Sequence, residues 1–470
     1  MTSATSVTVT ASGNDQVLTE PVQGQKVNEF QDGRVTHKYS WKASIYDWWK
    51  QGFGSYTDEQ VESNLLSILP FFPLLDGKRE AKVINTDIGN GNYIHEFYIE
   101  NKEKPSQSDK LAISASTKDV VLVHGYAASL GLFIDNFDEL SKVPGIQIHA
   151  IDLLGFGFSS RPKFPNLALA SAEDIQKVED WFVDSLEEWR KRRGLDKFIL
   201  MGHSFGGYLS CAYALKYQKE QIEKLVLISP VGVERSKYSY LNKVDQSDVV
   251  SPSEKMRQEA EEPNVHYENE VDSIDNSVKS SLRSNTPKVS EEEVPEAPKS
   301  FRRKLVEQLW INNVSPFTIL RNLGPAKSKL ISAWTSHRFA HFYDRDPQQF
   351  QSVHDYIYRI FNANGSGEYA LTRVLEPGTV LARMPLLDRC PEEFAKLKLP
   401  TLWLYGDKDW MNEQAGYEMT KEINTYSMKN SGKKLASFAI IPNAGHHLYL
   451  DNPSAFANTI FKFTGFKVPT

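Results

Sequence analysis

The strongest constraint on the fold of this chain is a serine flanked by glycines, in residues 202–206 (Gly-His-Ser-Phe-Gly). A four-residue apolar run, 198–201, precedes the motif, and apolar residues at helical spacing follow it over residues 208–215. This order predicts a strand, a strained turn and a helix, with the serine hydroxyl presented at the turn as in a nucleophile elbow. The glycines allow the close backbone approach that such a turn requires. The motif also occurs by chance in packing turns, so residues elsewhere in the chain must decide between the two interpretations.

Short apolar runs alternate with helical patterns over most of the chain. The run Val120–Val123 is typical of a strand buried on both faces, because it is fully apolar and rich in β-branched residues. A helix is predicted from the spacing of apolar residues over 175–189, with Ser171 as its N-cap and Asp174 three residues later. Strands are predicted near residues 93–99, 120–123, 146–151, 198–201, 225–228, 399–405 and 437–441. The alternation predicts an α/β fold with a mostly parallel, doubly wound sheet.

The alternation stops in the middle of the chain and resumes near its end. Residues 236–300 are polar and acidic with few apolar anchors, a composition typical of disorder. Residues 301–383 are rich in aromatic side chains with a helical pattern, so the insertion is predicted to form a helical cap over the strand ends. The predicted organisation is a disordered tail (1–36), an aromatic amphipathic segment (37–79), the first half of the core (80–232), the cap with its acidic insert (233–396) and the second half of the core (397–470).

The composition argues against several classes of function. A formal net charge of −6 provides no overall basic field for binding nucleic acid. Two cysteines, Cys211 and Cys390, argue against a disulfide framework and favour a reducing, intracellular compartment. The eleven histidines show no His-Glu-x-x-His spacing, so no metal site is expected. No apolar run reaches the length of about 18 residues that a membrane span needs, and we expect no targeting or lipidation signal.

An aromatic segment near the N-terminus has two interpretations of similar weight. Trp41, Trp48 and Trp49 lie close to Lys42 and Lys50. Aromatic rings interspersed with lysines suit a membrane interface, where amphipathic rings lie at headgroup depth. The same rings would equally suit a helix that packs on the core.

Further loops are predicted to bring reactive side chains to the edge of the sheet where Ser204 lies, because active sites of open parallel sheets form beyond the carboxyl ends of the strands. Asp407 and Asp409 follow one late strand, and His446 and His447 follow the last one. A serine hydroxyl needs an imidazole to take its proton, and the imidazole needs a carboxylate to hold its tautomer. The order Ser, Asp, His is that of a hydrolase triad. We assign Ser204 as nucleophile, His446 as base and Asp409 as the carboxylate, with His447 and Asp407 as competitors.

Two backbone N–H groups are needed to stabilise the oxyanion that forms when a serine attacks a carbonyl group. Phe205, which directly follows the serine, is predicted to supply one donor. A fourth loop, His124-Gly125-Tyr126, follows the strand at 120–123 and is predicted to supply the other, from the N–H of Tyr126.

These residues together resemble the α/β-hydrolase fold family, in particular the subgroup that contains abhydrolase-domain proteins 4 and 5 and the yeast cardiolipin-specific deacylase. The resemblance covers about residues 40–235 and 300–465 and rests on the loops at 124–132, 152–162, 406–411 and 445–446. In the family's acid loop, the carboxylate three residues after the glycine serves the triad, which favours Asp409. The histidine loop similarly favours His446. The subgroup also has an H-x4-D motif, present here as His446 to Asp451 and associated in the family with acyl transfer to lysophosphatidic acid.

The resemblance implies a serine acyl-ester hydrolase without a cofactor, acting on glycerophospholipids such as cardiolipin at a membrane surface. It leaves two alternatives open: an acyltransferase that uses acyl-CoA and lysophosphatidic acid, and a non-catalytic co-activator of a lipase on lipid droplets. Abhydrolase-domain protein 5 has lost the elbow serine, whereas this chain keeps Ser204, so hydrolysis is chemically available. The expected location is intracellular and peripheral to a membrane, on the mitochondrion or on a lipid droplet.

Overall fold

The computed structural model describes most of the chain between residues 56 and 468. The described residues are 56–104, 118–165, 167, 171–218, 220–236, 238–241, 308–310, 313–377 and 379–468, with short pieces at 27–29, 35–37, 40–43, 45–46 and 49. The predicted acidic insert therefore lies outside the described residues from position 242 onward.

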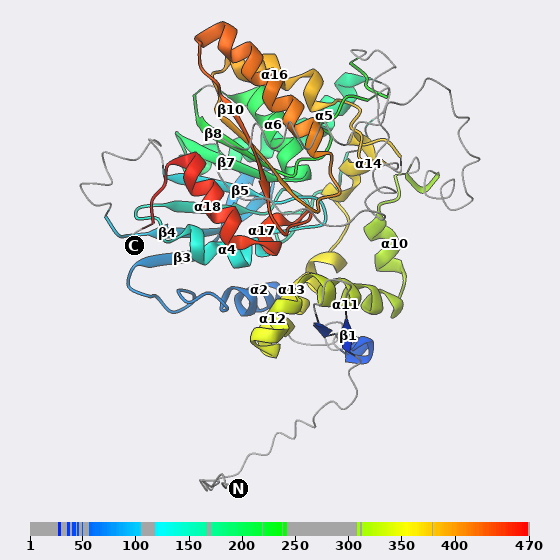
Figure 1. Cartoon of the computed structure of the whole chain (residues 1–470). Helices are drawn as coiled ribbons and strands as arrows, with labels where there is room; N and C mark the ends of the chain where they lie inside the picture. Colours follow the sequence, from blue (N-terminus) through cyan, green and yellow to red (C-terminus); the bar gives the residue numbers. More distant parts are fainter. Residues whose placement is uncertain are drawn as a thin grey trace, which may run out of the picture.

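An eight-stranded sheet runs through the centre of the described part of the chain (Figure 1). Its strands lie in the order β10-β9-β8-β7-β5-β6-β4-β3. β4 pairs antiparallel with β3 and β6, and every other neighbouring pair is parallel. The strands are β3 (Arg79–Gly89), β4 (Asn92–Asn101), β5 (Asp119–Val123), β6 (Gln147–Ile151), β7 (Phe198–His203), β8 (Ile222–Ile228), β9 (Thr401–Gly406) and β10 (Ala436–Ile441). The predicted α/β fold with a mostly parallel sheet is confirmed.

Helices cover both faces of this sheet, which explains why its central strands are apolar at successive positions. Val120 and Leu122 of β5 pack into one buried cluster, and Val121 and Val123 pack into another, because successive strand residues point to opposite faces. The first cluster includes side chains of α4 (Ile134–Leu140), α17 (Leu448–Asp451) and α18 (Pro453–Thr464). The second includes side chains of α5 (Ala172–Arg193), α6 (Phe205–Tyr217), α15 (Cys390–Lys396) and α16 (Glu413–Ser431).

Every strand predicted from the sequence is present, and so is the long helix α5. The Oγ of Ser171 accepts a hydrogen bond from the N–H of Asp174 at the start of α5, as predicted. The edge strand β3 was not predicted, because most of its side chains are exposed or only partly buried and its sequence lacks an apolar pattern. Within and just after the segment predicted as a disordered tail, β1 (Val27–Glu29) pairs antiparallel with β2 (Val35–His37).

The segment between β8 and β9 forms a cap of helices against the loops at the carboxyl ends of the strands (Figure 1). Its helix α13 (Pro347–Asn362) packs beside the N-terminal helix α2 (Asp58–Leu66). The hydroxyl of Tyr356 on α13 accepts a hydrogen bond from Gly131 N–H (3.3 Å), and a Cβ on Gly131 would lie 2.5 Å from the Tyr356 ring. The cap helices used below are α10 (Pro316–Asn322), α11 (Ala326–Arg338), α12 (Ala340–Arg345) and α13 (Pro347–Asn362).

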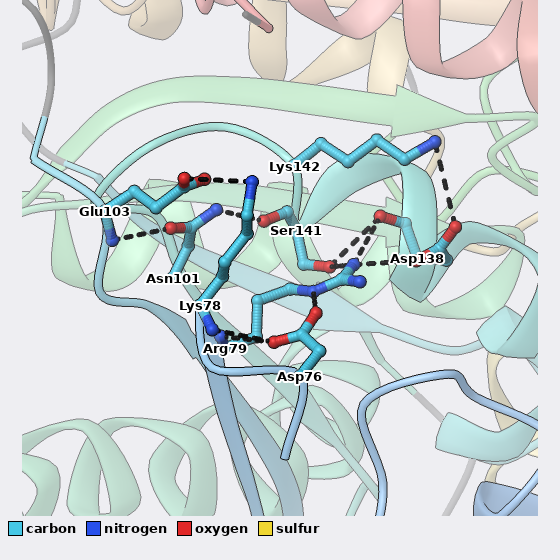
Figure 2. A network of polar contacts seen from close by, with 8 residues as sticks. All are labelled: Asp76, Lys78, Arg79, Asn101, Glu103, Asp138, Ser141 and Lys142. Atoms are coloured by element: carbon cyan, nitrogen blue, oxygen red, sulfur yellow. Dashed lines mark hydrogen bonds and ion pairs between the residues drawn. The ribbon is translucent and has the colours of Figure 1, made fainter.

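A polar network anchors the start of β3 to the end of α4 (Figure 2). The Asp76 carboxylate accepts hydrogen bonds from the N–H of Lys78 (2.9 Å) and from the N–H (2.8 Å) and Nε (2.7 Å) of Arg79. Burial alone would raise the pKa of Asp76, but these donors outweigh it and lower the pKa. Nη1 of Arg79 donates to Asp138 (2.7 Å) and Ser141 (3.0 Å). The network therefore fixes the edge of the sheet to a helix on one face.

Candidate active site

Ser204 lies at the turn between β7 and α6, with φ 52° and ψ −116°. A residue other than glycine rarely adopts a positive φ, so the backbone here is strained. Its N–H donates to the carbonyl oxygen of Ile228 on the neighbouring strand β8 (2.9 Å). A Cβ on Gly202 would lie 2.5 Å from the Gly206 oxygen, and one on Gly206 would lie 2.8 Å from the Val123 oxygen. The predicted strand–turn–helix geometry and the need for small flanking residues are confirmed.

The structure brings Ser204, His446 and Asp409 together from three loops. Ser204 Oγ lies 3.0 Å from His446 Nε2, and His446 Nδ1 lies 3.3 Å from Asp409 Oδ1. The three residues are buried, with 8%, 7% and 3% of their surfaces exposed. Burial alone would raise the pKa of Asp409, but hydrogen bonds and the charge of His446 outweigh it and lower the pKa. Asp409 is therefore ionised at neutral pH, where it can stabilise a proton on the imidazole.

The two competing residues have other contacts. The Asp407 carboxylate accepts hydrogen bonds from the N–H groups of Asn443 (2.9 Å) and Ala444 (2.8 Å), so it organises the loop that leads to His446. His447 Nδ1 instead faces Nη2 of Arg338 at 2.9 Å. Burial lowers the pKa of His447 well below its usual value, and the positive charge of Arg338 acts in the same direction.

Ser229 is a fourth member of the cluster that the sequence analysis missed. Its hydroxyl donates to Asp409 Oδ2 and lies 2.9 Å from His446 Nδ1. It directly follows β8, in the left-handed region with φ 47°, and is fully buried. An Nδ1–H on His446 can therefore donate to the Ser229 oxygen while the Ser229 hydroxyl donates to Asp409. The signal that could have found Ser229 is its place at the carboxyl end of a predicted strand.

His203, the second residue of the elbow motif, ties the elbow to the histidine loop. Its Nε2 donates to the carbonyl oxygen of His446 (2.9 Å), and its ring packs against the His446 ring with centroids 4.8 Å apart. Burial, and then the charge of His446, lowers the pKa of His203 well below its usual value, so His203 stays neutral. On the other side, the ring of Trp410 lies 4.6 Å from the His446 ring and is 44% exposed.

The predicted oxyanion loop lies against the serine. A Cβ on Gly125 would lie 3.0 Å from the Cβ of Ser204, so the backbone of this loop passes directly beside the candidate nucleophile. His124 donates from Nδ1 to the Gly125 oxygen (2.7 Å) and accepts at Nε2 from Leu153 N–H (3.0 Å), which defines one neutral tautomer. Burial lowers the pKa of His124 to about 4. The Tyr126 side chain is covered by the cap, where its ring packs against that of Phe317 (5.8 Å).

The loop at residues 152–162, which carries part of the family resemblance, is built around a buried carboxylate. Asp152 accepts hydrogen bonds from the N–H groups of Leu130 (2.7 Å) and Phe158 (2.8 Å). It thereby joins this loop to the segment that follows the oxyanion loop. Burial raises the pKa of Asp152 to about 6. A Cβ on Gly157 would overlap the Asp152 carboxylate, which explains the glycine there.

Asp451, the aspartate of the H-x4-D motif, contacts the backbone of the histidine loop. Its Oδ2 accepts a hydrogen bond from Gly445 N–H (2.9 Å), and its Oδ1 accepts one from Nη1 of Arg338 (2.8 Å). Within the described part of the chain, the carboxylate that contacts the His446 imidazole is that of Asp409.

The aromatic segment near the N-terminus is partly described. Trp41 is 51% exposed, Trp49 is 54% exposed and the ring of Tyr46 lies 6.2 Å from that of Trp49. Trp48 lies outside the described residues. The two described tryptophans therefore leave about half of their surfaces open to contact.

The described part of the chain shows neither a metal-binding cluster nor a membrane-spanning helix. No group of three or more His, Cys, Asp or Glu side chains in this part of the chain is arranged to hold a metal ion. None of its helices combines the length and the apolar composition that crossing a bilayer requires.

The chain belongs to the alpha/beta hydrolase fold family. The family model matches residues 119–453, which include the strands from β5 onward and all four residues of the cluster around His446. The sheet order, the strained turn at Ser204 and the sequence match thus agree on the class.

Several curated proteins that act on lipids are similar to this chain. A probable 1-acylglycerol-3-phosphate O-acyltransferase of Oryza sativa subsp. japonica is 32% identical over 345 residues, 73% of this chain and 66% of that protein. The 1-acylglycerol-3-phosphate O-acyltransferase ICT1 of Saccharomyces cerevisiae is 30% identical over 371 residues, 73% of this chain and 81% of that protein. A (lyso)-N-acylphosphatidylethanolamine lipase of Bos taurus is 28% identical over 340 residues, 72% of this chain and 76% of that protein. The match thus spans slightly less than two thirds of the rice protein.

Proposed function

We propose that this protein is a serine hydrolase that cleaves acyl esters of glycerophospholipids. The observation that carries the proposal is the placement of Ser204 Oγ 3.0 Å from His446 Nε2, with Asp409 and Ser229 on the other ring nitrogen. A serine with this support can become a nucleophile at neutral pH.

In the proposed reaction, His446 Nε2 takes the Ser204 proton as Oγ bonds to the ester carbonyl carbon. The carbonyl oxygen becomes an oxyanion, which the N–H groups of Phe205 and Tyr126 stabilise. The ester C–O bond then breaks, and the leaving lysophospholipid alkoxide receives the proton from His446. Water attacks the acyl-enzyme with His446 again as base, which releases the fatty acid and restores Ser204.

The substrate class rests on the relatives, which are named for reactions on phospholipids and lysophospholipids. Cardiolipin is our first candidate substrate, in acyl-chain remodelling. The exposed Trp41 and Trp49 support docking on a membrane surface, because tryptophan rings favour the interface. A peripheral location on the mitochondrion or a lipid droplet fits such a substrate.

Acyl transfer is the second candidate, because the rice and yeast relatives are named as acyltransferases. In that reaction, acyl-CoA would acylate Ser204, and the hydroxyl of lysophosphatidic acid would replace water as the attacking group. A non-catalytic co-activator is the third, and the intact Ser204–His446 pair argues against it.

One assay separates the three functions. Purified protein is incubated with phosphatidylcholine vesicles containing cardiolipin, with and without acyl-CoA and lysophosphatidic acid. Hydrolysis predicts fatty acid release that needs no acyl-CoA, is lost in Ser204→Ala and persists in Ser185→Ala, a buried serine on α5 that serves as the matched control. Product that forms only with acyl-CoA would favour transfer, and no turnover in either format would favour the co-activator.

Membrane docking has its own test. Deleting residues 38–56 should weaken binding to the same vesicles and leave hydrolysis of a short soluble ester unchanged. Unchanged vesicle binding would show that the tryptophans do not contact the membrane.

A further inference from the structure

We propose that Arg338 and Asp451 form a positioning pair through which the seated cap holds the His446 loop in its working geometry. Asp451 belongs to the H-x4-D motif, and in this arrangement it positions the histidine loop instead of taking a separate part in acyl transfer. The predicted effect of the pair on catalysis rests on the proposed function, whereas the predicted restraint of the histidine loop does not.

The pair holds the residues on both sides of His446. Asp451 Oδ2 accepts from Gly445 N–H (2.9 Å), and Arg338 Nη2 lies 2.9 Å from His447 Nδ1. Arg338 Nη1 donates to Asp451 Oδ1 (2.8 Å), which closes the network. Because the His446 carbonyl is itself held by His203, three consecutive residues of the loop are restrained.

The spacing of the H-x4-D motif follows from this geometry. α17 begins directly after the histidine loop, and the N–H of Asp451 donates to the carbonyl oxygen of His447 (3.0 Å) in a helical turn. From the end of this turn, the Asp451 side chain reaches back along the helix to the N–H of Gly445. The five-residue spacing between His446 and Asp451 thus brings the Asp451 carboxylate to the backbone of the loop, whereas Asp409 contacts the imidazole.

Arg338 connects the pair to the cap because it is the last residue of α11. α11 is fixed to α13 by hydrogen bonds between Thr335 Oγ1 and His354 Nδ1 (2.9 Å) and between the hydroxyls of Ser328 and Tyr358 (3.2 Å). α13 in turn holds the segment after the oxyanion loop through Tyr356. A seated cap therefore braces both sides of Ser204: one through Tyr356 and the other through Arg338.

The side chains of the pair are 18% and 19% exposed, so they are largely shielded from solvent. Arg338 offers two nitrogens in the fixed plane of the guanidinium, one to Asp451 and one to His447, which lysine cannot reproduce with a single ammonium. Losing Asp451 removes the acceptor of the Gly445 N–H, and losing Arg338 removes the side chain that holds the Asp451 carboxylate and contacts His447.

The experiment compares Asp451→Asn, Arg338→Met, the double variant and Arg338→Lys with wild type. Arg345→Met is the matched control, because Arg345 is a cap arginine that pairs with the Asp135 carboxylate of α4 instead of with Asp451. Three quantities are measured: kcat and KM for a short soluble ester, the rate at which a fluorophosphonate labels Ser204, and hydrogen exchange of the peptide containing Gly445. Thermal melting checks that each variant is folded.

A positioning pair predicts that kcat and the labelling rate fall about 10- to 100-fold in Asp451→Asn and Arg338→Met with KM unchanged, because small displacements of a base are costly. The double variant should match the single ones, and Arg338→Lys should recover part of the loss. Exchange at Gly445 should be faster in both single variants. Arg345→Met should resemble wild type in all three measurements.

Wild-type exchange, kcat and labelling in Asp451→Asn would overturn the inference. Loss of acyl transfer alone, with ester hydrolysis and labelling intact, would also overturn it, because Asp451 would then act in transfer chemistry. If wild type itself is not labelled, the proposed function fails, and the exchange measurement still decides whether the pair holds the loop.

Discussion

Replacing Asp409 with asparagine tests how the candidate triad works. Three groups face this carboxylate as donors: the Ser229 hydroxyl, the His446 Nδ1–H and the N–H of Met411 (3.0 Å). An asparagine NH2 group would face one of these donors, or would turn and donate to Nδ1. The second outcome fixes the imidazole with its proton on Nε2, where it can no longer accept the proton of Ser204.

The magnitude follows from what the carboxylate does. Removing its charge takes away both the correct tautomer and the stabilisation of the imidazolium, so kcat should fall about 1,000- to 10,000-fold. This corresponds to about 4 to 5.5 kcal/mol of activation free energy. The lowered pKa of Asp409 also predicts how stability depends on pH. The ionised carboxylate stabilises the fold above the unfolded-state pKa of 3.8, and this contribution is lost as the pH falls through the lower folded-state pKa.

Asp407→Asn is the matched control, because it makes the same chemical change two residues away. It weakens the bonds to the N–H groups of Asn443 and Ala444 at an exposed position, which should cost about 1 kcal/mol of stability and less than about 10-fold in kcat. The assay is steady-state hydrolysis of a soluble ester at pH 7.5, with melting curves for both variants. Equal losses in the two variants would refute the assignment of Asp409, and so would near wild-type activity of Asp409→Asn.

Three further predictions follow from the contacts around the site and the sheet. Ser229→Ala should lower kcat about 10- to 100-fold by removing a hydrogen bond to a charged group, and an equal loss in an Asp409→Asn background would contradict a shared role. Burial alone would lower the pKa of His95, but Glu62, at 2.8 Å, outweighs it and raises the pKa. This pair therefore stabilises the fold below the unfolded value of 6.5 and loses its effect as the pH rises through the folded-state pKa. Urea unfolding should show that Glu62→Gln costs more at pH 6 than at pH 8.5; an equal cost would contradict the pairing. Gly206→Ala should cost about 1 to 3 kcal/mol and much of the activity, since its Cβ would press on the carbonyl oxygens of residues 123 and 124; an unchanged melting temperature would refute this.

Local sequence rules predicted most of the fold and missed what lies at its edge. The buried strands were recognisable because both of their faces are covered, which makes them apolar at every position. β3 was missed because an edge strand faces solvent and carries no such pattern. Ser229 was missed for a similar reason, since a single serine after a strand is unremarkable until the strands are placed side by side.

The sequence by itself determined the order of the elements, the strained turn at Ser204 and the succession of serine, acid and histidine loops, because these depend on periodicity and on glycine at fixed positions. The tertiary structure decided which side chains meet. It placed Asp409 on the imidazole and Asp407 on the backbone, inserted Ser229 between acid and base, and joined Asp451 to the cap through Arg338. Some of these contacts join distant parts of the chain, since Arg338 and Asp451 are 113 positions apart. Others distinguish Asp407 from Asp409, which lie two residues apart in the same loop. Such choices depend on strand register and helix packing, which no local pattern encodes.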